Sequence, residues 1–192
     1  MKVNEIFYSL QGEGYYSGTA ATFIRLSGCN LKCPFCDTKH DNGVQMSEDE
    51  IIEIVQVNPA DLVVITGGEP TLQLTSTLID KLHSIKKYVA IETNGTRPIL
   101  QNVDWITVSP KQEFVGKSGL VNIHNANEVK VVYDGIHKIS CFDIIADYYY
   151  IQPCDTGNQK TNRDIVKQCV EFIKKNPKWK LSLQTQKILN VQ

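Results

Sequence analysis

Short apolar segments recur along the chain, and each is bounded by glycine, proline or polar residues of the kind that form turns. Their short length and their content of β-branched and aromatic residues predict strands rather than helices. The predicted strands are Thr22–Leu26, Leu62–Ile65, Val89–Glu92, Trp105–Val108, Glu128–Val132, Tyr149–Gln152 and Leu181–Leu183.

Helical patterns lie between several of these strands. The segment 47–50, Ser-Glu-Asp-Glu, has the form of a capping box and predicts a helix that continues through Ile51–Val55. Apolar residues also recur at helical spacing in Leu72–Leu82 and Thr161–Lys175. This alternation predicts right-handed crossovers and an α/β fold with mainly parallel strands. About six strands and three helices predict a partial TIM-type barrel (β6/α3-like) rather than a closed one.

Length and charge narrow the class of protein. The chain has 192 residues, the length of one ordinary domain, and no linker interrupts it, so a single domain over residues 1–192 is expected. A formal net charge of −1 argues against a general binder of polyanions, so no nucleic acid partner is expected. The first residues carry charges and begin no long apolar run. We therefore expect no membrane span and a cytoplasmic location.

In parallel α/β folds the working residues lie at the carboxyl ends of the strands. Glycine-rich or polar segments follow five of the predicted strands at that end, and they are expected to meet at one edge of the sheet. These segments are 27–29 (Ser-Gly-Cys), 66–70 (Thr-Gly-Gly-Glu-Pro), 93–96 (Thr-Asn-Gly-Thr), 109–111 (Ser-Pro-Lys) and 153–155 (Pro-Cys-Asp).

Three cysteines, Cys29, Cys33 and Cys36, fall in one short segment with C-x3-C-x2-C spacing. Three thiolates this close favour an iron–sulfur cluster whose fourth iron has no ligand nearby in the sequence. The spacing alone leaves two alternatives open, namely a structural zinc site completed by His40 and a set of buried thiols without a metal.

The cysteine segment after the first strand and Gly67-Gly68-Glu69-Pro70 after the second together resemble the radical S-adenosylmethionine (SAM) superfamily. The resemblance implies a radical SAM core in which Cys29, Cys33 and Cys36 hold a [4Fe–4S] cluster. It implies that the open iron chelates the amino and carboxylate groups of SAM. One electron from the cluster then cleaves SAM to methionine and a 5′-deoxyadenosyl radical, and the protein supplies orientation and exclusion of water.

Nearly the whole chain resembles the 7-carboxy-7-deazaguanine synthase family. The matching segments are 6–14 (Ile-Phe-Tyr-Ser-Leu-Gln-Gly-Glu-Gly), 23–26 (Phe-Ile-Arg-Leu), 36–38 (Cys-Asp-Thr) and 181–185 (Leu-Ser-Leu-Gln-Thr). The resemblance implies conversion of 6-carboxy-5,6,7,8-tetrahydropterin to 7-carboxy-7-deazaguanine with loss of ammonia, a step toward queuosine. It also implies a homodimer, catalytic use of SAM, assistance by Mg²⁺ and an electron donor such as flavodoxin or ferredoxin.

Several of the matching residues suit a flat, carboxylated substrate. The planar guanidinium of Arg25 can hold a carboxylate by two parallel hydrogen bonds, although a surface salt bridge is the alternative for this residue. Leu10, Gln11 and Gly12 form a turn that, with Glu13, can offer donors and acceptors to the edge of a pterin. Gly12 permits close approach of the backbone, and a plain glycine turn is the alternative.

The resemblance assigns the other site residues by position. Thr38 matches a ligand of Mg²⁺, which prefers hard oxygen donors, and Thr66 matches a substrate contact. Gln192 would supply a terminal carboxylate that closes over the substrate. Gln186 stands where many relatives have a histidine, and its amide does not titrate near neutrality. The residues matched to SAM are Gly68, Ser109, Pro110, Lys111, Gln152, Pro153, Cys154 and Asp155.

Two other functions fit parts of the pattern. A glycyl-radical activating enzyme uses the same cysteine spacing on a protein substrate, but Gln11, Glu13, Arg25 and Thr38 suit a small carboxylated heterocycle better. A non-catalytic iron–sulfur or zinc module would leave the Gly-Gly-Glu-Pro segment and the open iron without a role.

Overall fold

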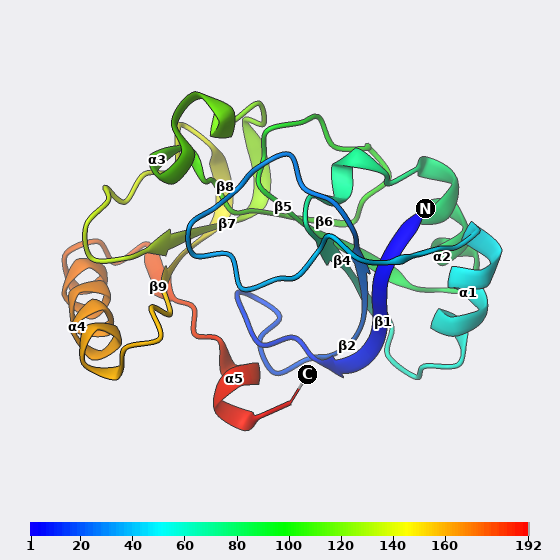
Figure 1. The fold of residues 1–192 in the computed structure, drawn as a ribbon, viewed down its shortest axis with the longest axis horizontal. Helices are drawn as coiled ribbons and strands as arrows, with labels where there is room; N and C mark the ends of the chain where they lie inside the picture. The colour runs from blue at the N-terminus through cyan, green and yellow to red at the C-terminus, as the bar shows by residue number, and fades with distance from the viewer. Residues whose placement is uncertain (192) are drawn as a thin grey trace.

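The computed structural model describes residues 1–191 and contains, within them, one sheet of nine strands. The strands lie side by side in the order β3-β1-β2-β4-β5-β6-β7-β8-β9, and Figure 1 shows that the sheet is curved. They are β1 (Lys2–Leu10), β2 (Ala20–Leu26), β3 (Val44–Gln45), β4 (Leu62–Gly67), β5 (Tyr88–Thr93), β6 (Trp105–Val108), β7 (Asn125–Tyr133), β8 (Ile145–Pro153) and β9 (Trp179–Leu181).

The predicted α/β fold with mainly parallel strands is confirmed. Along the strand order, each neighbouring pair from β2 to β9 is parallel, which makes seven parallel strands, one for each predicted strand and one more than the six of the expected partial barrel. β1 pairs antiparallel with β2, and the short β3 pairs antiparallel with β1; neither strand was predicted. β3 and β9 lie at opposite ends of the strand order, so the sheet is an open, partial barrel.

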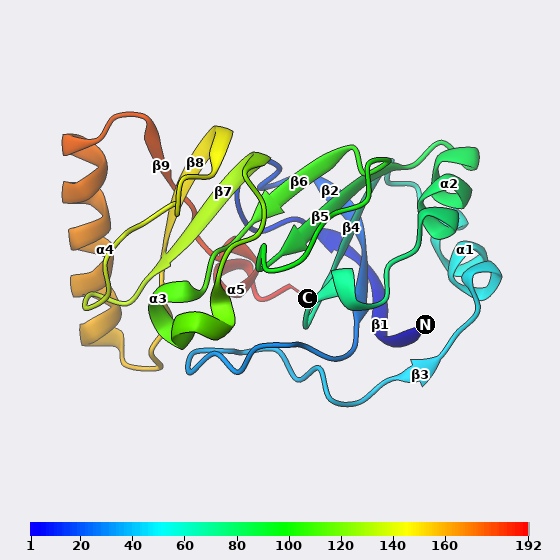
Figure 2. The ribbon, with the colours of Figure 1, turned by 90° about the horizontal axis from the view of Figure 1, so that it is seen from above.

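Helices cover the outside of the sheet near its two ends, as Figure 2 shows. α1 and α2 pack beside each other and α2 contacts β5, whereas α4 contacts β8 and β9. Within residues 1–191, no helix has both the length and the apolar character needed to cross a membrane. The helices are α1 (Glu48–Gln56), α2 (Ser76–Ser84), α3 (Gln112–Val115), α4 (Gln159–Lys175) and α5 (Thr185–Leu189), with 3-10 turns η1 (Pro70–Leu72) and η2 (Gly116–Gly119).

Local sequence accounts for where these helices begin. At the start of α1 the predicted capping box is present, because Ser47 accepts from the Glu50 backbone and Glu50 accepts from the Ser47 backbone. α2 begins later than predicted, at Ser76, because the Thr75 hydroxyl caps it and residues 70–72 form a separate 3-10 turn.

Two buried clusters fix the sheet against its helices. In the first, Ile24 and Ile65 of the sheet pack with Leu78 and Leu82 of α2. In the second, Val129 of β7 and Ile151 of β8 pack with Ile165 and Cys169 of α4. Burial of one such aliphatic side chain contributes about 1.5–3 kcal/mol, so the strands form a rigid support. Parallel pairing then brings the carboxyl ends of β2, β4, β5, β6, β7 and β8 to one edge.

Candidate active site

A cavity of about 720 Å³ opens among the carboxyl ends of the strands, the cysteine segment and α5. Pro110 lies buried between two lining residues and does not line the cavity itself, and Gln192 lies outside the described residues. All the other predicted site residues line it: Leu10, Gln11, Gly12, Glu13, Arg25, Cys29, Cys33, Cys36, Thr38, Thr66, Gly68, Ser109, Lys111, Gln152, Pro153, Cys154 and Asp155.

The Gly-Gly-Glu-Pro segment packs against the start of the cysteine loop, residues 27–43. A Cβ atom on Gly68 would lie 2.0 Å from the carbonyl oxygen of Gly28, so only glycine fits there. Glu69 is fully buried and accepts from Thr93 Oγ1 at 2.7 Å and from the Asn94 backbone at 2.8 Å. These bonds tie the end of β4 to the end of β5 and leave backbone groups exposed to the cavity beside the cysteines.

The three cysteines of the loop are free thiols that face the same cavity. The Leu31 backbone N–H donates to Cys29 Sγ at 3.4 Å, and the Cys36 thiol donates to the Thr38 carbonyl at 3.6 Å. Burial raises the pKa of Cys29 and of Cys33, while the nearby Lys111 ammonium acts in the opposite direction on both pKa values. Ligation therefore requires that protons leave these thiols.

The donor set suits an iron–sulfur cluster, because three thiols from one loop line the cavity. Among residues 1–191, no three His, Cys, Asp or Glu side chains lie close enough together to share one metal ion. A cubane attaches three thiolates to three different irons and leaves the fourth iron open. His40 also lines the cavity; within the described part of the chain, its Nδ1 is buried without a hydrogen-bond partner and lies 3.7 Å from Asp41. Thr38 offers one hydroxyl at the cavity, which suits Mg²⁺ that keeps waters and substrate oxygens.

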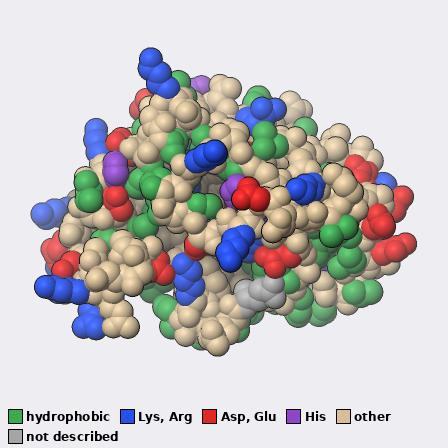
Figure 3. All heavy atoms as spheres, in the orientation of Figure 1, with side chains coloured by type: hydrophobic (Ala, Val, Ile, Leu, Met, Phe, Trp, Pro, Cys, Tyr) green, Lys and Arg blue, Asp and Glu red, His purple; other side chains and the backbone are tan. Residues whose placement is uncertain are grey.

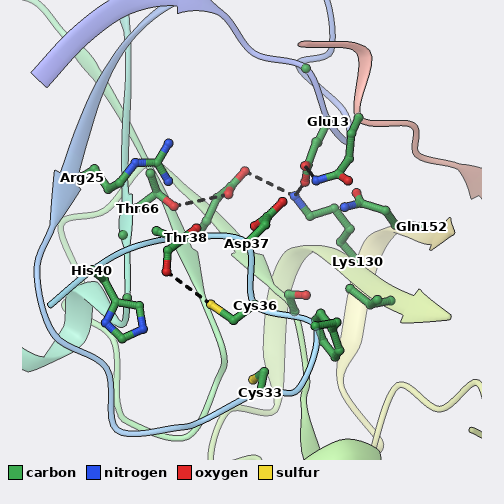
Figure 4. A pocket seen from close by; sticks show the side chains of 18 of the residues that line it. Glu13, Arg25, Cys33, Cys36, Asp37, Thr38, His40, Thr66, Lys130 and Gln152 are labelled. Atoms are coloured by element: carbon green, nitrogen blue, oxygen red, sulfur yellow. Dashed lines mark hydrogen bonds and ion pairs between the residues drawn. The ribbon is translucent and has the colours of Figure 1, made fainter. Parts of the chain in front are cut away.

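Arg25 lies on β2 and faces the cavity, opposite Lys130 and Gln152 in Figure 4. Its Nε donates to Glu5 Oε1 at 2.6 Å, so a salt bridge is present, as the alternative interpretation expected. The pair nevertheless belongs to the cavity wall, because both residues line it. The salt bridge and a carboxylate site are therefore compatible at this arginine.

A buried lysine that the sequence analysis missed lies between two carboxylates of the cavity wall. Lys130 Nζ donates to Glu13 Oε2 at 2.5 Å and to Glu92 Oε1 at 3.4 Å (Figure 4). Burial alone would raise the pKa of Glu13, but the Lys130 ammonium and hydrogen bonds from Gln184 and Gln186 lower it to about 2. Burial would lower the pKa of Lys130, and the surrounding carboxylates raise it instead. The site thus holds a charged pair at neutral pH.

Glu92 and Glu128 complete this polar wall. Glu92 accepts from Gln11 Nε2 at 3.0 Å and from Thr66 Oγ1 at 3.5 Å, which joins three residues of the cavity. Glu128 is buried behind them and accepts from the Tyr15 backbone at 2.9 Å; burial raises its pKa to about 7. Glu128 and Lys130 occupy alternate positions of a strand that was predicted from its apolar residues. Burying a charge is costly without a partner, so this pattern was a detectable signal of a buried ion pair.

Burial also changes the pKa of Lys111, which lines the cavity together with the cysteines. The Lys111 ammonium donates to the Ser109 carbonyl at 2.7 Å and to Ser109 Oγ at 2.5 Å. Burial lowers the pKa of Lys111 to about 8, so the lysine remains mainly charged at neutral pH. It therefore supplies a cation in the segment that the sequence analysis assigned to SAM.

The C-terminal segment docks onto the turn that follows β1. Thr185 donates from its backbone and its hydroxyl to the Gly12 carbonyl, at 3.1 and 2.8 Å. Gln184 and Gln186 both donate to Glu13 Oε1, at 3.0 and 3.2 Å. A Cβ atom on Gly12 would lie 1.7 Å from Gln186 Oε1 and 2.8 Å from the Gln186 backbone nitrogen, so a larger residue would displace the segment. The turn and α5 together form one wall of the cavity.

Lys187 continues this contact to the other side of the cavity. Its ammonium lies 2.9 Å from Asp37 of the cysteine loop and 3.4 Å from Asp155 after β8.

On the face seen in Figure 3, acidic side chains gather toward the side of α1 and basic ones toward the side of α4, and both signs occur near the centre. Neither sign dominates that face, in keeping with the small net charge.

Comparison with known proteins shows which family this chain resembles. Residues 23–112 match the model of the radical SAM superfamily. A 7-carboxy-7-deazaguanine synthase of Bacteroides thetaiotaomicron is 50% identical over 192 residues, covering 100% of this chain and 98% of that protein. A 7-carboxy-7-deazaguanine synthase of Burkholderia multivorans is 38% identical, covering 98% of each.

A solved structure supports the same relationship. QueE from Escherichia coli superposes with a TM-score of 0.74 at 28% identity, covering 95% of this chain and 92% of that one. Full-length identity at this level, together with a matching fold and a cavity that contains the three cysteines, identifies the relationship. The chain belongs to the 7-carboxy-7-deazaguanine synthase family of radical SAM enzymes.

Proposed function

We propose that this chain converts 6-carboxy-5,6,7,8-tetrahydropterin to 7-carboxy-7-deazaguanine with loss of ammonia, in the biosynthesis of queuosine. The observation that carries the proposal is one cavity in which the three cysteines lie together with Arg25 and with a hydrogen-bonding wall of paired acidic and basic side chains. Such a wall suits a flat substrate that has one carboxylate and several ring nitrogens.

Arg25 and the Gln11 turn bind the substrate in this proposal. The guanidinium of Arg25 holds the substrate carboxylate by charge-assisted hydrogen bonds. On the opposite wall, Glu13 and Glu92 accept hydrogen bonds from Lys130 and can also accept hydrogen bonds from the N–H groups of the pterin edge. Gln11 and Thr66 already donate to Glu92, so they fix the direction in which its oxygens point.

Cys29, Cys33 and Cys36 would hold the [4Fe–4S] cluster, and Thr38 would provide an oxygen for Mg²⁺. When bound, the reduced cluster supplies one electron for the cleavage of SAM. Backbone groups at Gly68 and the segments Ser109–Lys111 and Gln152–Asp155 would hold SAM in the cavity. α5 and Lys187 cover the cavity from the side and exclude water from the reaction.

The assembly and partners belong to the same proposal. The chain acts as a single radical SAM domain over residues 1–192, forms a homodimer and receives electrons from a flavodoxin or a ferredoxin. Free cysteines that ligate a cluster require a reducing compartment, which favours the cytoplasm. Light scattering after size-exclusion chromatography measures the mass of the assembly, and a monomer mass would contradict the homodimer.

Anaerobic turnover tests the reaction itself. The iron–sulfur-reconstituted protein is incubated with SAM, Mg²⁺, dithionite and 6-carboxytetrahydropterin, and 7-carboxy-7-deazaguanine is followed by mass spectrometry. A second readout is the EPR spectrum of the reduced cluster, which SAM should perturb. A reduced cluster that does not respond to SAM would support a non-catalytic module, whereas a response without product would leave the superfamily assignment and contradict the substrate.

A further inference from the structure

Glu5 and Arg25 face each other because β1 contains a bulge. The strands pair Val3 with Leu26 and then Glu5 with Arg25, so two steps along β1 match one step along β2. The extra residue is Asn4. Without it, the register set by Val3 would place Asn4 opposite Arg25. Bulges of this kind occur next to active sites and redirect side chains.

The bulge also connects the strand to the cysteine loop. The Asn4 side chain donates to the carbonyl oxygens of Lys39 and Asn42, both at 3.0 Å. The loop that carries the cysteines is therefore attached to the residue that sets the position of Glu5.

The same register places two stacked aromatic rings beside Arg25. Phe7 pairs with Phe23 across the strands, and their rings stack with centroids 4.8 Å apart and planes 7° from parallel. The guanidinium carbon of Arg25 lies 5.6 Å from the centroid of the Phe7 ring. Glu5, Phe7, Phe23 and Arg25 all line the cavity. The guanidinium thus has a ring on one side and a carboxylate at Nε.

The contact with Glu5 uses only the Nε edge of the guanidinium. Nε donates at 2.6 Å, and no hydrogen bond joins the terminal nitrogens to another residue between 1 and 191. An arginine has five N–H donors in a fixed fork, so one carboxylate at Nε leaves donors for a second carboxylate on the terminal nitrogens. A long side chain that is held at one edge also loses less freedom when the ligand binds.

We propose that Glu5 is a positioning residue for substrate specificity: it fixes the guanidinium of Arg25 so that the terminal nitrogens receive the carboxylate of the substrate. This inference rests on the proposed function, because it assumes a carboxylated pterin. Glu5 acts through hydrogen-bond acceptance rather than through its charge, since a negative charge beside a carboxylate site does not attract the ligand. Selection for the carboxylated substrate therefore depends on a residue that does not touch it.

Binding measurements on the reconstituted holoenzyme with SAM and without reductant test the inference. The two probes are 6-carboxytetrahydropterin and the tetrahydropterin that lacks the carboxylate. E5A should weaken binding of the carboxylated probe about tenfold and leave the other probe unchanged. E5Q should remain within about threefold of the wild type, because its amide oxygen still accepts from Nε. E53A removes a carboxylate from the exposed side of α1 and should bind both probes as the wild type does.

Each contrary result has a separate meaning. E5A that weakens both probes equally indicates general damage to the site and overturns the inference, as does E5Q that is as weak as E5A. A wild type that does not distinguish the probes contradicts the proposed substrate as well. If E5A does not fold, F7L, which removes the ring beneath the guanidinium, should also weaken only the carboxylated probe; equal effects on both probes would overturn the inference.

Discussion

Lys130 Nζ lies 2.5 Å from Glu13 Oε2, and this ion pair joins the sheet to the turn on which the C-terminal segment docks. The lysine comes from the middle of β7, while Glu13 follows β1 and accepts from Gln184 and Gln186 through its other oxygen. Removal of one member of a buried pair leaves the other charge unpaired in a medium that solvates it poorly. The pair therefore affects both the stability of the fold and the position of the cavity wall.

Replacement of Lys130 by methionine should lower the free energy of unfolding by about 3 kcal/mol, because Glu13 and Glu92 lose their buried cation. Urea denaturation of the reconstituted protein measures the change. Lys167 provides a matched control, since its pair with Asp164 is exposed, and K167M should change stability by less than about 0.5 kcal/mol. Equal effects of the two substitutions would contradict the role given to the buried pair.

Glu128 should make the folded protein less stable as the pH rises from about 4.5 to 7. Burial raises its pKa in the folded state to about 7, so the native protein holds a proton that the unfolded chain has released. E128Q removes this titration, and its stability relative to the wild type should increase by about 3 kcal/mol between pH 4 and pH 8. Urea denaturation at both pH values provides the test, and a difference that does not depend on pH would contradict the raised pKa.

Cys33 should be necessary for the cluster, because its thiol is one of three that face the cavity from one loop. Reconstituted C33A should lose most of its bound iron and sulfide and form no 5′-deoxyadenosine from SAM. C141A lies outside the loop and should keep the iron and sulfide content of the wild type. Full iron content in C33A would contradict the assignment of the ligands.

A methyl group on Gly12 should displace the C-terminal segment. The added Cβ of G12A would lie 1.7 Å from Gln186 Oε1 and 2.8 Å from the backbone nitrogen of Gln186. We expect an approximately tenfold higher KM for the pterin with a smaller change in kcat, since the moved wall belongs to the binding site. Truncation of the second side chain in G12A/Q186A should restore part of the loss, and no recovery would indicate that the clash lies elsewhere.

Local patterns in the sequence predicted the parts of the fold that local interactions determine. The capping box at Ser47 and the apolar parallel strands are of this kind. β1 was missed because Asn4, Glu5 and Ser9 interrupt its apolar pattern, and Glu5 faces the cavity rather than a hydrophobic core. β9 begins two residues earlier than predicted, since its register follows its pairing with β8, which no local pattern records.

The residues of the candidate site were also predicted only in part. Cys29, Cys33, Cys36 and Arg25 belong to recognisable motifs, and the structure brings all four to one cavity. Lys130 and Glu92 lie within strands whose apolar neighbours suggested a core, so their place in the cavity wall depends on the curvature of the whole sheet. The partnership of Glu5 with Arg25 depends on a bulge, and the sequence offers no simple signal for it.

The most direct test of the proposed reaction is to quantify 7-carboxy-7-deazaguanine and remaining SAM together during anaerobic turnover of the reconstituted chain. Product should accumulate well beyond the amount of SAM consumed, ammonia should appear in equal amount to product, and R25A should form little product. Cleavage of SAM to 5′-deoxyadenosine without any 7-carboxy-7-deazaguanine would contradict the proposed substrate, even if the cluster were intact.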